Sequence, residues 1–332
     1  MEDLTRARFP EVRAAAGHYE SYYLRAAHPT ERLGVWIRYT VHKRPGSLPN
    51  GSLWFTLFDA GANGPLASKV KHPPPELGVG DGAWIEIAGS RFQPGRAKGE
   101  ANSEHCRASW ELEFDHAADA LLHLPRGWMY RTPIPRTKTL SPHPAALFRG
   151  RLSVDGRTIE LDGWPGMVGH NWGAEHAERW IWMHGIGFEG EDEGTWLDLA
   201  IGRIKMGPFT TPWIGNGAIS LGGERRRLGG AERARSTQVR ETPTGCEFAL
   251  AGNGISVRGT VGSEARNFVG WIYADPDGPP HNTVNCSISD MRLSVSRDGG
   301  DELALESSGG ATYELGMRET GHGIPLQPFP DG

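Results

Sequence analysis

Glycine and proline interrupt this chain so often that short strands are favoured over long helices. Its 332 residues include 46 glycines and 24 prolines, so nearly every ten-residue stretch contains one of them. This spacing favours short strands joined by turns. Alternation supports the same conclusion, because Val35, Ile37, Tyr39 and Val41 share one side of an extended segment.

Turn residues stand where such strands would reverse. Asp155-Gly156 separates two alternating apolar segments, and residues 298–300 (Asp-Gly-Gly) separate two more. Helical periodicity is confined to residues 11–16 and 116–124. The sequence therefore predicts an all-β chain that forms two antiparallel barrels or sandwiches packed together, with few short helices.

The length of 332 residues favours two domains. We expect an N-terminal β domain over 1–174 and a C-terminal β-barrel domain over 175–332. The proline-rich segment 131–148 precedes this boundary and is predicted to be extended. No internal repeat is strong enough to be claimed, although two barrels of similar size would be compatible with an eroded one.

Charge and composition exclude several classes of partner. A net charge of −5 without a long basic run argues against nucleic-acid binding. The densest basic cluster, Arg225-Arg226-Arg227, lies between glycine pairs and is interpreted as a solvated turn. No segment has the roughly 18 uninterrupted apolar residues of a membrane helix.

The cysteines and the N-terminus bear on location. The three cysteines, Cys106, Cys246 and Cys286, are far apart and form no CxxC pair, which favours a reducing compartment. The first twelve residues lack the apolar core of a signal peptide. We therefore expect a soluble, cytoplasmic protein. The sequence does not indicate its oligomeric state.

Residues 163–188 contain four tryptophans and three histidines and are the richest source of functional candidates. Within them, alternation places Trp180, Trp182 and His184 on one face of a strand. Such a strand could line a cavity, with His184 as a hydrogen-bond donor to a ligand. Alternatively it belongs to a barrel core in which His184 donates to a carbonyl group.

His170, Asn171 and Trp172 lie between Gly169 and Gly173 and are predicted to occupy a sharply turned loop. They either satisfy buried backbone groups and plug a barrel end, or they contact a ligand.

Ionisable residues follow directly. Glu175 could act as a general acid if aromatic surroundings raise its pKa, and His176 beside it could accept a proton. A surface position is the simpler alternative for Glu178. The spacing of His170, His176 and His184 matches no compact set of metal ligands, so no metal is expected. The alternative is a histidine–carboxylate site folded across two strands.

No cofactor is expected either. Residues 185–190 match the dinucleotide pattern GxGxxG, but four acidic residues lie between 189 and 193, where a pyrophosphate would have to bind. This segment is better interpreted as the rim of a hairpin.

The order of these motifs resembles the tandem lipocalin-like proteins, a group that includes carotenoid 1,2-hydratases, AttH-like proteins, tocopherol cyclases and fungal Diels–Alderases. Members carry a D-H-x-W-G signature followed by a W-x-W strand. His170, Trp172 and Gly173 match the signature, and Trp180 and Trp182 match the strand. The resemblance is clearest over residues 163–229.

One position departs from the signature. Gly169 stands where the group has aspartate, the natural candidate for protonating an alkene or carbonyl in its hydratases and cyclases. That acid chemistry is therefore in doubt unless Glu175 or Asp198 replaces it.

The resemblance implies two lipocalin-like domains with an apolar pocket and cofactor-free hydration, cyclisation or cycloaddition of a lipophilic molecule such as an isoprenoid or polyketide. The first hypothesis is thus an isomerase- or lyase-type enzyme with His170 and Glu175 as acid/base groups. Its ligand-binding residues would be Asn171, Trp172, Trp180, Trp182, His184 and Asp198. The alternatives are a non-catalytic carrier or sensor of a lipophilic ligand, and an interaction scaffold whose aromatic residues are all core.

Overall fold

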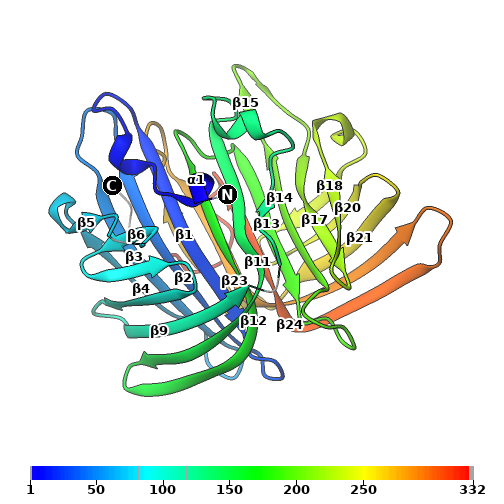
Figure 1. Cartoon of the computed structure of the whole chain (residues 1–332), viewed down its shortest axis with the longest axis horizontal. Helices are drawn as coiled ribbons and strands as arrows, with labels where there is room; N and C mark the ends of the chain where they lie inside the picture. The colour runs from blue at the N-terminus through cyan, green and yellow to red at the C-terminus, as the bar shows by residue number, and fades with distance from the viewer. Residues whose placement is uncertain (1, 81, 117, 329–332) are drawn as a thin grey trace.

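The chain folds into two large antiparallel sheets that lie against each other, as Figure 1 shows for this computed structural model. The structure describes residues 2–80, 82–116 and 118–328. Every ladder between its named strands is antiparallel, which confirms the predicted all-β class. Within the described residues, no helix is long and apolar enough to span a membrane.

The first sheet uses the strands up to Gly173, in the spatial order β4-β3-β2-β1-β12-β11-β9-β8-β7-β6-β5, with β10 added beside β11. These strands are β1 (His18–Ala27), β2 (Leu33–Lys43), β3 (Asn50–Asp59), β4 (Leu66–His72), β5 (Leu77–Gly78), β6 (Ile85–Ile87), β7 (Ser90–Gln93), β8 (Arg96–Asn102), β9 (Arg107–His116), β10 (Leu121–Leu122), β11 (Thr137–Val154) and β12 (Arg157–Gly173).

The second sheet uses the strands from Arg179 onward, in the order β18-β17-β14-β13-β24-β23-β21-β20-β19, with β22 added beside β23. These strands are β13 (Arg179–Ile186), β14 (Trp196–Arg203), β17 (Ile214–Leu221), β18 (Glu224–Gly229), β19 (Gln238–Thr242), β20 (Gly245–Ala251), β21 (Ile255–Gly262), β22 (Val269–Tyr273), β23 (His281–Arg297) and β24 (Glu302–Met317). A separate hairpin pairs β15 (Lys205–Met206) with β16 (Phe209–Thr210).

The two sheets repeat one topology. In each, the first strand pairs with the last, as β1 does with β12 and β13 with β24. In each, the last two strands form the longest hairpin, and a short strand, β10 or β22, is added beside the first strand of that hairpin. Register shifts interrupt both long hairpins at comparable places. The internal repeat that the sequence does not reveal is therefore visible in the strand order.

The predicted turns are confirmed. Asp155 and Gly156 both have positive φ, as the tight turn between β11 and β12 requires. Residues 298–300 lie between β23 and β24. The proline-rich segment 131–148 is extended in its second half, where it forms the first part of β11.

The predicted helices are wrong in place. The helices are short: α1 (Glu2–Thr5) and the 3-10 turns η1 (Phe9–Glu11), η2 (Pro74–Glu76), η3 (Gly127–Tyr130), η4 (Ala231–Arg233) and η5 (Ala265–Asn267). Residues 12–16 contain no helix, and Leu121–Leu122 is a strand. Pairing with β11 satisfies the backbone of that short segment, so that tertiary contact overrides its local helical pattern.

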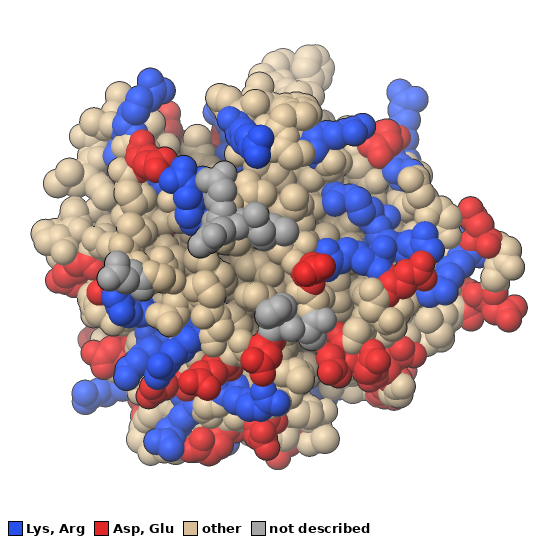
Figure 2. Space-filling view, in the orientation of Figure 1, with Lys and Arg blue, Asp and Glu red and all other residues tan. Residues whose placement is uncertain are grey.

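The arginine cluster is also not a solvated turn. It lies on β18, where Arg225 donates to the carbonyl of Ala120 and Arg227 to those of Leu122 and His123. These bonds hold the segment around β10 against the second sheet. On the face shown in Figure 2, basic and acidic side chains are interspersed.

The two sheets share buried contacts. Trp36 and Trp54 of the first sheet pack in one apolar cluster with Trp271 of the second. The fully buried Arg25 donates to the backbone carbonyls of Ser287, at 2.9 Å, and Gly310, at 3.0 Å. The surfaces that face each other therefore position side chains from both halves of the chain around a common space.

Candidate active site in a cavity between the two sheets

A cavity of about 740 Å³ lies between the sheets and is lined mainly by apolar and aromatic side chains. The first sheet contributes Tyr19, Tyr23, Trp36, Arg38 and Asn171, and the second contributes Trp180, Ile181, Trp182, Ile201, Tyr273 and Glu314. The segments between strands add Arg136, Glu175, His176 and the hairpin residues Ile204 to Gly207. A largely apolar cavity with a few polar groups is typical of a small-molecule site.

The structure places four of the eight predicted site residues at this cavity: Asn171, Glu175, Trp180 and Trp182. The other four, His170, Trp172, His184 and Asp198, are buried and do not line it.

Alternation on β12 explains part of this division. His170, Asn171 and Trp172 do not form a turned loop, because β12 continues as far as Gly173. Successive side chains of a strand point to opposite faces, so Asn171 faces the cavity while its two neighbours face away. The flanking glycines allow close packing: a Cβ at Gly173 would lie 2.1 Å from the carbonyl oxygen of Arg136.

His170 belongs to a buried cluster at the N-terminus. Its Nε2 lies 2.9 Å from Oε1 of Glu20, and its ring stacks between Tyr22 and Trp172 at centroid distances of 4.0 and 4.5 Å. Glu20 also accepts hydrogen bonds from the backbone amides of Arg8 and Phe9. Burial opposes ionisation of Glu20, but the bonds from His170 and His18 outweigh it and lower the pKa of Glu20 to about 2.

Asp198 and His184 lie under the wall of the cavity. Asp198 accepts hydrogen bonds from the indole of Trp182 at 3.3 Å and from the hydroxyl of Ser141 at 2.5 Å. His184 donates from Nε2 to the carbonyl of Pro144 at 2.8 Å, which is the core arrangement considered as the alternative above. His123 lines the cavity, and its Nε2 lies 3.4 Å from Oδ2 of Asp198.

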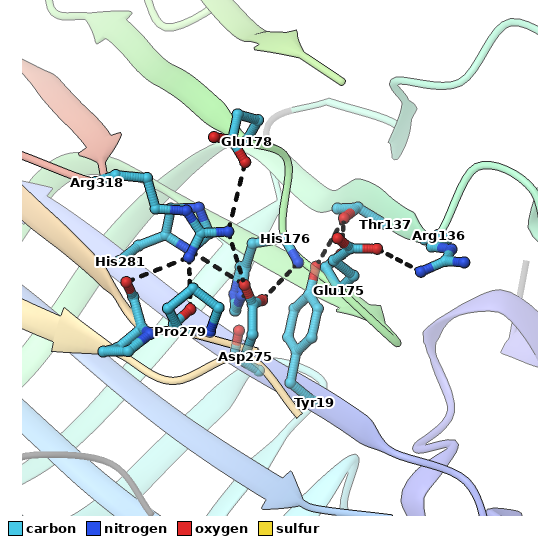
Figure 3. A network of polar contacts seen from close by, with 12 residues as sticks. Tyr19, Arg136, Thr137, Glu175, His176, Glu178, Asp275, Pro279, His281 and Arg318 are labelled. Carbon is cyan, nitrogen blue, oxygen red and sulfur yellow. Dashed lines mark hydrogen bonds and ion pairs between the residues drawn. The ribbon is translucent and has the colours of Figure 1, made fainter. Parts of the chain in front are cut away.

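An ionisable cluster that borders the cavity through His176 and Glu178 is centred on Asp275 (Figure 3). Its Oδ1 lies 2.8 Å from the backbone nitrogen of His176 and 2.7 Å from Nδ1 of the same residue. Its Oδ2 lies 3.3 Å from Nδ1 of His281 and 3.5 Å from the guanidinium of Arg318. Glu178 pairs with Arg318 at 3.5 Å.

Two aromatic rings hold the imidazole of His176. Tyr19 stacks on it at 3.9 Å between centroids, and Trp180 at 5.3 Å. Since Nδ1 donates to Asp275, the unprotonated nitrogen of the neutral ring is Nε2, which is buried and has no partner among the described residues. Burial lowers the pKa of His176 to about 4, although Asp275 opposes this shift, so the ring is neutral near pH 7.

Sequence reasoning identified His176 but missed its partners. Asp275 and His281 are separated from it by about a hundred residues and belong to no recognisable motif. The one local signal is the unusual density of prolines and aspartates at 275–280 between two apolar strands.

His176, Asp275 and His281 each place one nitrogen or oxygen atom within 4.8 Å of the others, a spacing that a metal ion could bridge. The donor set does not favour one. The backbone amide and the ring of His176 occupy one carboxylate oxygen, and Arg318 places a positive charge beside the other. We therefore interpret Asp275 as the group that orients His176.

The position of the missing aspartate is filled by another side chain. A Cβ at Gly169 would lie 2.1 Å from Cζ and 2.4 Å from the hydroxyl oxygen of Tyr23, so the Tyr23 ring occupies the space that a side chain at 169 would need. Tyr23 lines the cavity, and its hydroxyl forms no hydrogen bond within the described residues. Burial, with the charges of Asp198 and Glu314, raises the pKa of this phenol well above its ordinary value.

Glu175 lies at the edge of the cavity rather than among aromatic rings. Its carboxylate pairs with Arg136 at 2.5 Å, and both side chains are substantially exposed. Its backbone carbonyl accepts a hydrogen bond from Thr137, which also receives the hydroxyl of Tyr19 at 3.1 Å (Figure 3).

Comparison with known proteins gives relatives of the same length. No model of a known protein family matches the chain. The chain is 28% identical over 330 residues to an uncharacterized protein found in two strains of Mycobacterium tuberculosis, covering 96% of this chain and 93% of the relative.

Three solved structures share the fold over nearly the whole chain. A putative AttH from Nitrosomonas europaea has a TM-score of 0.55 at 13% identity, covering 96% of this chain and 97% of its own. Kievitone hydratase from Nectria haematococca has a TM-score of 0.52 at 10% identity, covering 92% of this chain and 90% of its own. CghA, solved with Sch210972, has a TM-score of 0.54 at 11% identity, covering 91% of this chain and 89% of its own. The chain therefore has the tandem lipocalin-like fold that its sequence resembles.

Proposed function

We propose that this protein is a cofactor-independent enzyme of isomerase or lyase type that acts on a lipophilic small molecule. The observation that carries the proposal is the arrangement of His176 at the cavity. A buried carboxylate fixes its tautomer, the residue lines the cavity, and Nε2 is buried without a partner among the described residues. A neutral imidazole held in this way is a general base or hydrogen-bond acceptor for a bound molecule.

Tyr23 supplies a hydrogen-bond donor, the complement of the base His176. Its raised pKa keeps the phenol protonated, and its unpaired hydroxyl at the cavity can donate to an oxygen or a developing carbanion of the substrate. A base and a donor in one apolar cavity suit proton abstraction with redelivery, which isomerises a substrate. They equally suit addition or removal of water.

The aromatic wall would shape the substrate. Trp180 and Trp182 could hold an extended molecule, such as an isoprenoid or polyketide, in a folded conformation and so reduce the entropic barrier to reaction. Their π faces also stabilise positive charge that develops in a cyclisation. Kievitone hydratase, one of the similar structures, is named for a hydration reaction, which agrees with this class of chemistry.

A carrier of a lipophilic ligand is the second candidate. Gly169 in place of aspartate favours it, because the proton donor of the hydratase and cyclase members is missing at that position. The cavity would then bind the same molecules and leave them unchanged.

Incubation of the purified protein with an organic extract of its source cells separates the two. Liquid chromatography with mass spectrometry should show one compound replaced by an isomer or by a product that differs by one water. His176→Gln should lower that rate at least about 100-fold. The matched control His170→Gln should keep the rate per folded molecule.

Two results would contradict the proposal. A compound that is retained by the protein but chemically unchanged would support the carrier. Full turnover by His176→Gln would refute the role of His176.

A further inference from the structure

Arg38 is a buried cation that faces the cavity without a carboxylate partner. It lies in the middle of β2, is 5% exposed, and lines the cavity. Its guanidinium carbon lies 4.2 Å from the ring centroid of Tyr273 and 5.4 Å from that of Trp54. These rings stabilise the positive charge but accept no strong hydrogen bonds.

The hydrogen bonds of Arg38 are incomplete. Within the described residues it donates once, from one terminal nitrogen to Oγ of Ser21 at 3.0 Å, and it forms no ion pair. The fully buried Arg25 shows the contrast, because both of its terminal nitrogens donate to backbone carbonyls. A buried guanidinium with free donors is costly unless an anion completes it.

The buried carboxylate among the residues that line the cavity, Glu314, already accepts hydrogen bonds from its neighbours. Glu314 accepts hydrogen bonds from the indole of Trp180 at 3.0 Å and from the hydroxyl of Tyr273 at 3.1 Å. It also accepts one from the amide of Asn285 at 3.1 Å. Glu314 therefore balances charge in this region without occupying the free donors of Arg38.

Hydrogen bonds through Ser21 connect Arg38 to a second donor, the side-chain amide of Asn171. Ser21 accepts from Arg38 and donates to Oδ1 of Asn171. With its oxygen occupied, Asn171 has its amide NH₂ free to face the cavity, which it lines. Together with the hydroxyl of Tyr23, the first sheet thus presents donors to the cavity, while the second presents mainly Trp180, Trp182 and Ile201.

We propose that the cavity binds a lipophilic carboxylic acid as its anion, with the carboxylate on Arg38 and Asn171 and the apolar part along the tryptophans. A guanidinium binds a carboxylate through paired N–H···O bonds, and an amide NH₂ adds a third. This inference names the substrate class of the proposed enzyme and rests on that function only for the claim that the bound acid is turned over.

The test compares cis-parinaric acid with its methyl ester, since both are fluorescent and differ only in the charged group. Titration of the full-length protein should show the acid binding roughly 10- to 100-fold more tightly than the ester, as expected for a charged hydrogen bond. Arg38→Met should abolish this preference while ester affinity changes less than about twofold. Arg38→Lys keeps the charge but loses the paired geometry and should retain part of the preference.

Arg136→Met is the matched control, because Arg136 is an exposed arginine at the same cavity that already pairs with Glu175. It should keep the preference for the acid. Equal affinity of the wild-type protein for acid and ester, an unchanged preference in Arg38→Met, or binding of neither probe would overturn the proposal. Acid and ester are compared on the wild-type protein without any variant, so the proposal stays testable even if Arg38→Met misfolds.

The assay measures binding alone. A lost preference for the acid would leave the turnover test of His176 intact. Failure of turnover would likewise leave the acid preference to stand as the specificity of a carrier.

Discussion

His170 and His176 are six residues apart and have almost the same surroundings, yet only one of them lies at the cavity. Each ring is bonded to a buried carboxylate, Glu20 or Asp275. Each also stacks on a tyrosine, at 4.0 Å for His170 and 3.9 Å for His176. Burial lowers the pKa of both rings.

The difference lies in the orientation of each ring. His170 uses Nε2 for its carboxylate, and its Nδ1 is enclosed by the core around Tyr22 and Trp172. His176 uses Nδ1, and the residue lines the cavity. A carboxylate–histidine pair is therefore not evidence of catalysis by itself. In both rings the second nitrogen is buried and has no partner, and only His176 borders the cavity in which a ligand can bind.

The largest expected effect tests whether the cluster around His170 is structural. Glu20→Gln should lower the free energy of unfolding by about 3–5 kcal/mol, because it removes the buried charge that His170 and two backbone amides share. Urea unfolding followed by tryptophan fluorescence measures this loss.

Glu175→Gln is the control, since it breaks an exposed ion pair and should cost less than about 1 kcal/mol. Similar losses in the two variants would show that the Glu20 cluster does not hold the fold together.

The next effect uses His184, which is buried like the other two but has no carboxylate bonded to it. Burial, and secondarily Arg25, lowers its pKa to about 4, although Asp198 and the bond to Pro144 oppose the shift. Below pH 6.5 the His184 ring of the unfolded chain binds a proton, whereas the same ring in the folded protein stays neutral until the pH approaches 4. The free energy of unfolding should therefore fall as the pH drops from 6.5 to 4.

His184→Gln removes this titration and keeps a donor for Pro144. Between pH 6.5 and 4 the variant should therefore lose about 3 kcal/mol less of its free energy of unfolding than the wild type does. The pKa values of His170, His176 and His322 are lowered too, so these residues contribute to the remaining slope, whereas Glu20 acts below pH 4.5. Urea unfolding at several pH values measures the slopes. Parallel curves for wild type and variant would contradict a depressed pKa at His184.

The smallest effect concerns Gly169, which directly precedes His170 and is packed against Tyr23. Gly169→Ala should cost about 1–3 kcal/mol, because its Cβ would lie 2.1 Å from the Tyr23 ring. In a Tyr23→Ala background the same change should cost much less, which a double-mutant cycle of urea unfolding detects. Equal costs in both backgrounds would mean that Tyr23 does not fill the space beside Gly169.

Much of the fold was predictable because it depends on local chemistry. Asp155-Gly156 adopts positive φ at both residues, and the segment from Trp180 to His184 forms a strand as expected. The loop predicted at His170 to Trp172 was wrong for an informative reason. Its flanking glycines are required for close approach of the Tyr23 ring and the Arg136 carbonyl, and a sequence does not distinguish that requirement from a turn.

The sequence by itself determined the antiparallel strands, their turns and the aromatic segment that became a cavity wall, since period-two alternation and turn chemistry act between neighbours in the chain. Tertiary structure alone decided which histidine meets the cavity, and it supplied Asp275, Tyr23 and Arg38 as neighbours of the site. These residues come from different strands of two sheets. Their chemistry arises from burial and from pairing across the fold, which no local pattern in the chain records.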